Sequence, residues 1–171
     1  MIATNRLILR TFTLKDTEKV FIMSIEDGMK KWIPDQVYAD ENEAREVLGF
    51  LISCCNEPDP EKKPFVLGIE LKSTGELIGH AGLSPLNHGE VEIGYAVEEK
   101  HQGKGYATEA VKALSEYGLK HFRLKSVTGV VDSMNTASVR VLEKAGYMFV
   151  KEEVRKAFGR TVPCSIFKFG R

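Results

Sequence analysis

Residues 91–110 read VEIGYAVEEKHQGKGYATEA, a strand pattern that runs into a glycine-rich turn and then into a helix pattern. Bulky apolar side chains alternate up to Val97 and predict a β-strand with one buried face. The opposite face of this strand is nearly bare and carries a single carboxylate, Glu92. A bare strand face leaves room for a ligand.

The turn places Gly103 and Gly105 at the start of the predicted helix. The first backbone N–H groups of a helix have no partner within it, and the positive end of the helix dipole lies there, so this arrangement favours an anion. Glycine also lets the backbone approach phosphate oxygens closely. A tight turn leading into an amphipathic helix would give the same pattern, because short glycine motifs are weak evidence.

Two common phosphate-binding motifs are excluded by their spacing. The GxxxxGK[ST] loop is absent, since Lys104 stands between the glycines, and this argues against a P-loop phosphotransferase. The dinucleotide motif GxGxxG is incomplete because Thr108 occupies its third glycine position. Lys125 stands about where a ribose-binding acid would be expected.

The chain as a whole has the composition of a globular protein. Its 171 residues fit one domain, which we expect to span residues 1–171. Basic and acidic residues number 24 each, so the charge indicates neither a nucleic-acid nor a membrane partner. No apolar run approaches the ~18 residues of a membrane span, and the N-terminus lacks the pattern of a signal peptide. We therefore expect a cytoplasmic protein.

The periodicity predicts a mixed α/β (α+β) fold, with a mostly antiparallel sheet of about seven strands and helices on both faces. Strands are expected over residues 6–13, 65–71, 77–83, 89–97 and 125–132, and two more in the tail 147–169, joined near Phe158. Helices are expected over residues 14–25, 41–55, 105–122 and 135–145. Gly146 is expected to end the last helix.

Cysteines and histidines show no metal-binding spacing. Cys54 and Cys55 are adjacent and Cys164 is distant, so we interpret all three as packing residues in a reducing compartment. The four histidines, at positions 80, 88, 101 and 121, share no ligand spacing. The sequence therefore predicts no metal site.

Two motifs, taken together, resemble a known family. Gln102–Ala107 matches the Q/R-x-x-G-x-G/A motif of the GNAT superfamily of N-acetyltransferases. Residues 135–147, NTASVRVLEKAGY, match the N-x-x-S-x-x-x-x-E-K-x-G-F/Y signature of its branch of RimJ- and RimL-like ribosomal-protein N-acetyltransferases. The opening TNRLILRTFTLKD and the segment KWIP also resemble this branch. The resemblance covers nearly the whole chain and implies a single GNAT domain.

The resemblance implies that acetyl-CoA binds as co-substrate beside the strand and the turn. Backbone groups of Tyr95, Ala96 and Val97 would pair with the pantetheine amides. Asn135 would hydrogen-bond to the cofactor arm, although it is also a good N-cap for the helix that follows. Ser138 would lie near the thioester sulfur. The pyrophosphate would be held by the residues of the turn, which are Gln102, Gly103, Lys104, Gly105, Tyr106, Ala107 and Thr108.

The activity implied by the resemblance is acetyl transfer by direct attack of a primary amine on the thioester. The acceptor would be a small amine or a protein or peptide N-terminus, and a homodimer is compatible with the family. Glu92 is the candidate base, because partial burial would raise its pKa toward a useful value. A solvent-facing strand glutamate is the alternative interpretation.

Three positions depart from the family pattern. Leu142 stands where many members have a tyrosine that protonates the departing thiolate, so Ser138, water or Tyr147 would have to serve. Thr161 and Pro163 replace a tryptophan and an aspartate of the branch, which puts a ribosomal-protein acceptor in doubt. A non-catalytic acyl-CoA-binding or sensor domain therefore stays open as the alternative function.

The acceptor itself is expected to meet the segment 26–56. Acidic residues outnumber basic ones there, which favours a cationic acceptor, although a solvated helix face would show the same composition. Trp32 is interpreted either as a wall of the acceptor pocket or as a core residue. The charges that carry this expectation are Asp27, Asp35, Asp40, Glu41, Glu43 and Glu46, against Lys30, Lys31 and Arg45.

Overall fold

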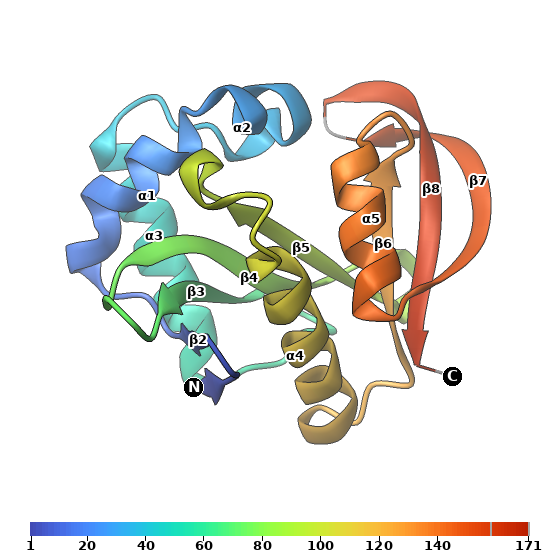
Figure 1. Cartoon of the computed structure of the whole chain (residues 1–171), viewed down its shortest axis with the longest axis horizontal. Helices are drawn as coiled ribbons and strands as arrows, with labels where there is room; N and C mark the ends of the chain where they lie inside the picture. Colours follow the sequence, from blue (N-terminus) through green and yellow to red (C-terminus); the bar gives the residue numbers. More distant parts are fainter. Residues whose placement is uncertain (158, 171) are drawn as a thin grey trace.

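The structure, a computed structural model, describes residues 1–157 and 159–170, with only the backbone of His88. Phe158 and the His88 side chain, both named in the sequence analysis, lie outside this part. The described strands form one eight-stranded sheet in the order β1-β2-β3-β4-β5-β6-β8-β7 (Figure 1). The strands are β1 (Ile2–Ala3), β2 (Leu7–Arg10), β3 (Phe65–Leu71), β4 (Leu77–Pro85), β5 (Val91–Val97), β6 (Ser126–Asp132), β7 (Met148–Ala157) and β8 (Arg160–Gly170).

The predicted mixed α/β fold with a mostly antiparallel sheet is confirmed. β5 and β6 run parallel, and every other neighbouring pair of described strands runs antiparallel. The sheet has one strand more than expected, because Ile2 of β1 pairs with Leu9 of β2. Two residues are too few to show an apolar alternation in the sequence.

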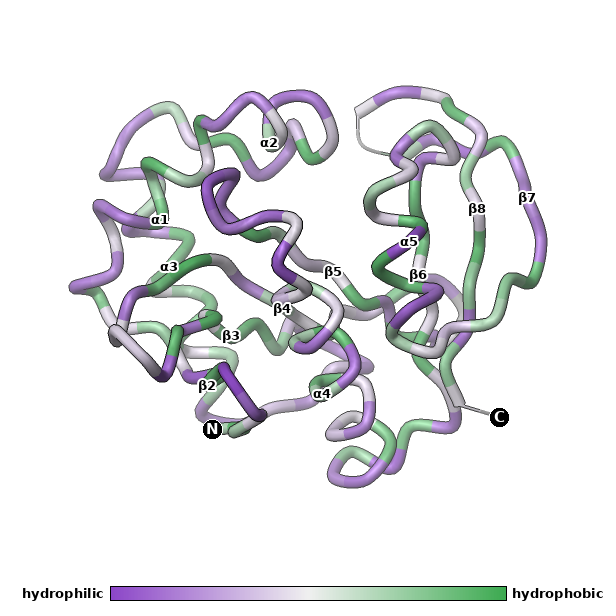
Figure 2. The backbone as a smooth tube through the Cα atoms, viewed as in Figure 1, coloured by the Kyte–Doolittle hydropathy of each residue, from purple (hydrophilic) through white to green (hydrophobic). Residues whose placement is uncertain are grey.

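Helices cover both faces of the sheet, as expected. On one face α4 (Tyr106–His121) and α5 (Thr136–Ala145) contribute Leu114 and Leu142 to the main core. On the other face α1 (Thr17–Ser24) and α3 (Glu41–Asn56) contribute Met23 and Leu48 to a smaller core. In Figure 1, α4 lies in front of the sheet and α3 behind it. The sheet is therefore buried on both sides, while the segment between β5 and α4 is strongly hydrophilic in Figure 2.

The segment between β2 and β3 differs from the prediction. Instead of one helix over residues 14–25, a 3-10 helix (Leu14–Asp16) precedes α1, and a further helix, α2 (Asp27–Trp32), follows it. The chain leaves helical geometry before Pro34: Ile33 has a φ of −137° and Pro34 opens a 3-10 turn (Pro34–Gln36), because a residue before proline avoids helical geometry. The six residues of α2 are too few for a periodic pattern.

None of the helices in residues 1–157 and 159–170 has the length and apolar character needed to cross a membrane.

Candidate active site

The site begins where β5 and β6 separate. The two strands pair at one register, Glu92 with Thr128, and then diverge, as their orientations in Figure 1 show. A side chain on Gly79 of β4 would collide with the carbonyl oxygen of Ala96, so the backbone of Ala96 is directed toward β4. Because successive residues of a strand direct their backbone groups to opposite sides, Tyr95 and Val97 are the ones that face the β5–β6 gap.

One backbone group in the gap already has a partner. The Nε2 of Gln102 donates to the carbonyl of Val97 at 2.9 Å. This bond ties the end of β5 to the segment that precedes the glycine turn. Gln102 therefore positions the turn through its side chain. The sequence motif had assigned it to cofactor binding.

The turn has the geometry that the glycines indicated. Gly103 and Gly105 have φ values of 75° and 81°, a left-handed conformation that favours glycine, and α4 begins at Tyr106. Within the described residues, no side chain caps the N-terminus of α4. By contrast, Asp40 accepts a hydrogen bond from the N–H of Glu43 at the start of α3. The first N–H groups of α4 are thus left for solvent or for a bound anion.

Arg6, which the sequence analysis did not single out, contacts the turn and the first turn of α4. Its Nη1 donates to the carbonyl of Lys104 at 2.9 Å, and its Nε donates to Glu109 at 2.7 Å. Its guanidinium also lies 4.6 Å from the centre of the Tyr106 ring. These contacts neutralise the carboxylate in the first turn of α4, which would otherwise repel an anion at that end. No sequence motif joins residue 6 to residues 104–109.

Asn135 occupies the N-cap of α5. Its side-chain oxygen accepts a hydrogen bond from the N–H of Ser138 at 3.1 Å, so the capping interpretation is confirmed. The Asn135 amide nitrogen is a donor that this cap does not use. Contact between Asn135 and a cofactor stays a prediction.

Glu92 lies half-buried on the face of β5 turned away from α4 and α5. Burial raises its pKa from 4.5 to about 7, although the charge of Arg155 opposes the shift and that of Asp35 adds to it. A carboxyl group with such a pKa exchanges protons near neutral pH, as a general base must. The neighbouring hydroxyl of Thr128 is buried and has no hydrogen-bond partner among the described residues.

A tyrosine hydroxyl meets Ser138 across the gap. The Oη of Tyr95 lies 2.7 Å from the Oγ of Ser138 and 3.1 Å from the Ser138 carbonyl oxygen. Burial raises the pKa of Tyr95 to about 12, so the phenol stays protonated and can donate a hydrogen bond. The sequence analysis assigned only backbone groups of Tyr95, because a side chain on the buried strand face is expected to serve packing.

Tyr147, a candidate acid in the sequence analysis, lies elsewhere. Only 3% of its surface is exposed, and its hydroxyl pairs with the Oγ of Ser115 inside the core. Burial raises the pKa of this phenol well above its usual value. The structure therefore places Tyr147 in the packing between α4 and β8 rather than at the gap. Its ring lies against that of Phe169 at a tilt, with the ring centres 5.1 Å apart.

A pocket lies between the β4–β5 pair and the α1–α2 segment. The side chain of His80 faces it, and burial lowers the pKa of this imidazole to about 4, so it is neutral at neutral pH. Burial also raises the pKa of Glu26 at its rim. Trp32 is not part of this wall. The pocket is lined by Val20, Met23, Ser24, Glu26, Met29, Gln36, Tyr38, Gly79, His80, Ala96, Val97 and Glu98.

Most charges of the segment 26–56 do not face this pocket. The Asp27 side chain is 97% exposed, and Glu41 and Glu46 are exposed on α3. Glu26 lines the pocket, and Asp35 does not line it but acts through its charge on Glu92. The solvated-face interpretation therefore holds for the α3 acids, whereas Glu26 and Asp35 are the acids placed near the candidate site.

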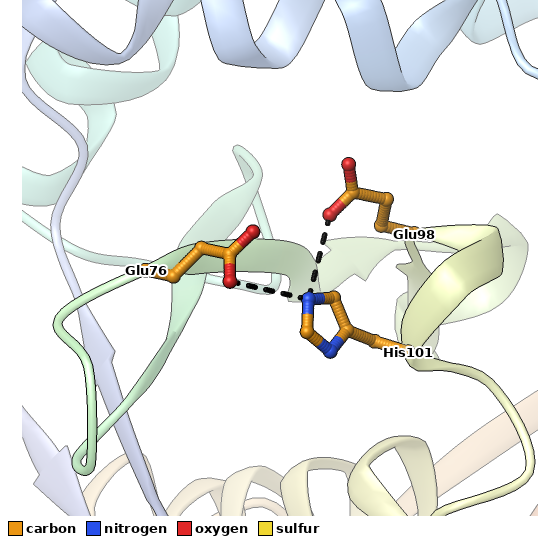
Figure 3. A group of neighbouring side chains, drawn as sticks. All are labelled: Glu76, Glu98 and His101. Carbon is orange, nitrogen blue, oxygen red and sulfur yellow. Dashed lines mark ion pairs between the residues drawn. The ribbon is translucent and has the colours of Figure 1, made fainter.

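A cluster of Glu76, Glu98 and His101 supports the segment before the turn (Figure 3). Their ligand atoms lie within 4.8 Å of one another, which the linear spacing of the histidines did not indicate. The Nζ of Lys19 lies 2.6 Å from Glu98, and that of Lys100 lies 2.7 Å from Glu76. Because each carboxylate already has an ammonium partner, we assign the cluster to holding Glu99–His101, the 3-10 turn that leads into the glycines.

Comparison with known proteins identifies the family. A family model described as an acetyltransferase (GNAT) domain matches residues 6–148. The chain belongs to this family. An uncharacterized N-acetyltransferase, p20, of Bacillus licheniformis is 30% identical over 170 residues, covering 96% of this chain and 92% of that protein. The sequence resemblance is thus confirmed, and the chain is an N-acetyltransferase by family.

Solved structures share the GNAT fold. An acetyltransferase of this family from Bacillus anthracis superposes with a TM-score of 0.83 at 24% identity, over 98% of this chain and 96% of that one. The ribosomal-protein alpha-N-acetyltransferase RimL, solved in complex with coenzyme A, gives a TM-score of 0.82 at 14% identity, over 97% and 94% of the two chains.

Replacing Glu92 by glutamine is expected to stabilise this GNAT domain at high pH. The folded-state pKa of about 7 lies above the ordinary value of 4.5, so the folded protein binds this proton more tightly than the unfolded chain does. The stability linked to the group is full below pH 4.5 and is lost as the pH rises through 7.

Glu92→Gln removes that loss and should raise the unfolding free energy at pH 8 by on the order of 1–3 kcal/mol. Urea unfolding of both proteins at pH 8 and near pH 5 measures the difference, which should shrink at the lower pH. A difference that is the same at both values would contradict the burial of this carboxyl group.

Proposed function

We propose that this chain transfers an acetyl group from acetyl-CoA to a primary amine. The observation that carries the proposal is the uncapped start of α4 beside the backbone of β5 that faces the gap. Pantetheine amides would pair with Tyr95 and Val97, and the N–H groups of residues 102–108 would hold the pyrophosphate. Ala96 would form part of the pocket wall instead, because its carbonyl is directed toward β4.

Glu92 would take the proton from the acceptor ammonium. With a pKa of about 7, a substantial fraction of this group is ionised at neutral pH and can accept that proton. Acetyl-CoA supplies the acyl group as a thioester. The neutral amine then attacks its carbonyl, and the departing thiolate needs a proton. Ser138 and Tyr95 share a hydrogen bond at the gap, and we assign that proton to this pair.

The pair would take the place of the tyrosine of the family pattern. Leu142, at that position, is 1% exposed, and a side chain on Gly129 of β6 would collide with it. A residue at position 142 thus points into the core. The hydroxyl of Tyr95 approaches Ser138 from the strand instead of from the helix.

The pocket beside His80 would receive the acceptor. Glu26 contributes negative charge to its lining, while Glu98 is paired with Lys19 and His80 is neutral at neutral pH. Met23, Met29 and Tyr38 offer apolar contact. This lining favours amines with additional positive charge over neutral ones, with a preference that weakens as salt is raised. Whether the acceptor is a small amine or a protein N-terminus is left to the assay below, and a cytoplasmic location stays a prediction.

Gly103→Ala is expected to weaken CoA binding by about 10-fold or more, whereas Gly75→Ala should not. Both glycines have left-handed φ values, 75° and 71°, and a Cβ on either meets nothing within 4 Å. Both substitutions should therefore cost a similar backbone strain of about 1–2 kcal/mol. Only Gly103 lies in the proposed phosphate site. Calorimetry with CoA distinguishes the two, and equal affinities would remove the phosphate assignment.

The acetyltransferase function is tested by thiol release from acetyl-CoA with a panel of amines. The panel contains peptides with free N-termini, polyamines, amino acids and aminoglycosides. Glu92→Gln should lower kcat by about 10²-fold with CoA affinity retained. Glu90→Gln is the matched control. Glu90 lies two residues before Glu92, immediately before β5, and pairs with Lys168. CoA binding without thiol release for any amine would favour the sensor alternative.

Tyr95→Phe and Tyr147→Phe are expected to affect different properties, the first the turnover rate and the second the stability. Tyr95→Phe removes the hydroxyl paired with Ser138 and should lower kcat by about 10-fold or more with little change in stability. Tyr147→Phe breaks a core hydrogen bond with Ser115 and should lower the unfolding free energy by about 1–3 kcal/mol with kcat retained. Kinetics and urea unfolding of both variants decide; unchanged kcat in Tyr95→Phe would return proton donation to Ser138 or water.

A further inference from the structure

β7 leaves a long sheet edge open. It is the last strand in the sheet order, and in the part of the chain that the structure describes no strand pairs with its outer side. Its ten residues contrast with the two residues of β1 at the opposite edge. Figure 1 shows nothing beyond β7 on that side. Free N–H and C=O groups along such an edge are a template for another strand.

Large apolar side chains are exposed along this edge. Met148 is 74% exposed, Phe149 59%, Val150 50% and Val154 72%. In Figure 2 hydrophobic and hydrophilic segments alternate along β7. A strand that had only to remain solvated would not concentrate apolar side chains in this way, because exposed apolar patches promote association. The strand is therefore suited to a protein partner rather than to water alone.

The charges of β7 identify which partner fits. Around Val154 the sequence reads KEEVRKA, with two acids before the valine and two bases after it. In an antiparallel pair with Val154 opposite the partner's Val154, Glu153 faces the partner's Arg155. In the same register Glu152 faces the partner's Lys156. The two-fold symmetry repeats both pairs, so all four charges meet an opposite charge.

The neighbouring registers fit less well. Side chains that face each other across the pair must lie on the same face of the sheet, so the nearest alternative registers are centred on Glu153 or on Arg155. The first places Glu153 opposite the partner's Glu153 and Lys151 opposite the partner's Arg155. The second places Arg155 opposite the partner's Arg155 and leaves Glu153 opposite the partner's Ala157. Opposite charges directly across a ladder are favourable and like charges are unfavourable. The charge pattern thus selects the register centred on Val154, and a second copy of this chain provides it.

We propose that two copies of this chain associate through β7, antiparallel and centred on Val154, into one continuous sheet. Within one chain Glu153 already pairs with Lys151 and Arg155, at 2.5 Å each. These charged side chains are therefore held in place on β7 before two chains associate. Arg155 also acts on the charge of Glu92. The junction therefore lies near each of the two proposed catalytic sites, although the pairing itself does not depend on the proposed activity.

Complementary charge reversal tests the register. Glu152→Lys/Glu153→Arg places bases opposite bases in a homodimer, and Arg155→Glu/Lys156→Glu places acids opposite acids. Each variant alone should be monomeric by light scattering at micromolar concentration and low salt, where the wild type is dimeric. An equimolar mixture should form a heterodimer, because all four pairs again become opposite in charge. Circular dichroism checks that each variant is folded.

Two further variants keep the test decisive. Glu41→Lys/Glu46→Lys reverses two exposed charges on α3 and should remain dimeric, which controls for net charge. Val154→Lys places two ammonium groups at the symmetry axis and should be monomeric. Because it changes only one exposed residue, it tests the proposal even if a double variant does not fold. A monomeric wild type, or a dimer that survives Val154→Lys and both reversals, would overturn the proposal. Monomers that do not associate on mixing would overturn the register.

Discussion

The single paired register between β5 and β6 determines most of what surrounds it. Parallel strands cannot be joined by a hairpin, and here α4 makes the connection between them. The strands keep one paired register, Glu92 with Thr128. Beyond it, the backbone of β5 borders an opening, and α4 begins at the end of that opening. Strand edge, glycine turn and helix dipole are thus brought together by one topological constraint.

Two groups at this point are placed unfavourably for the stability of the fold. Glu92 is held where its ionised form is poorly solvated, and the Thr128 hydroxyl beside it is buried without a partner among the described residues. Neither arrangement helps the fold, since buried polar groups are favourable only when they are hydrogen-bonded. The rest of the structure compensates through the main core under α4 and α5, whose residues, such as Val111 and Leu114, are fully buried. Such local destabilisation is common at functional sites.

The sequence predicted the parts that have a period or a short-range motif. The strand at Val91–Val97, the helix at Tyr106–His121 and the left-handed glycines were readable because each depends on residues close in the chain. The site was less readable where distant segments meet. Arg6 reaches Lys104, Tyr95 reaches Ser138, and Glu76 approaches His101. No local pattern records such pairs, so they required coordinates.

The contact of Arg6 with Glu109 bears on the order in which the chain can become functional. The two residues are separated by 103 positions, and the same guanidinium donates to the carbonyl of Lys104 in the turn at the head of α4. During synthesis the N-terminal segment emerges first and must wait for α4 before it can dock, since domains generally fold as units. A nascent chain released before Arg6 has docked on α4 would contain Gly103 and Gly105. It would lack the Arg6 contacts that hold the turn in shape.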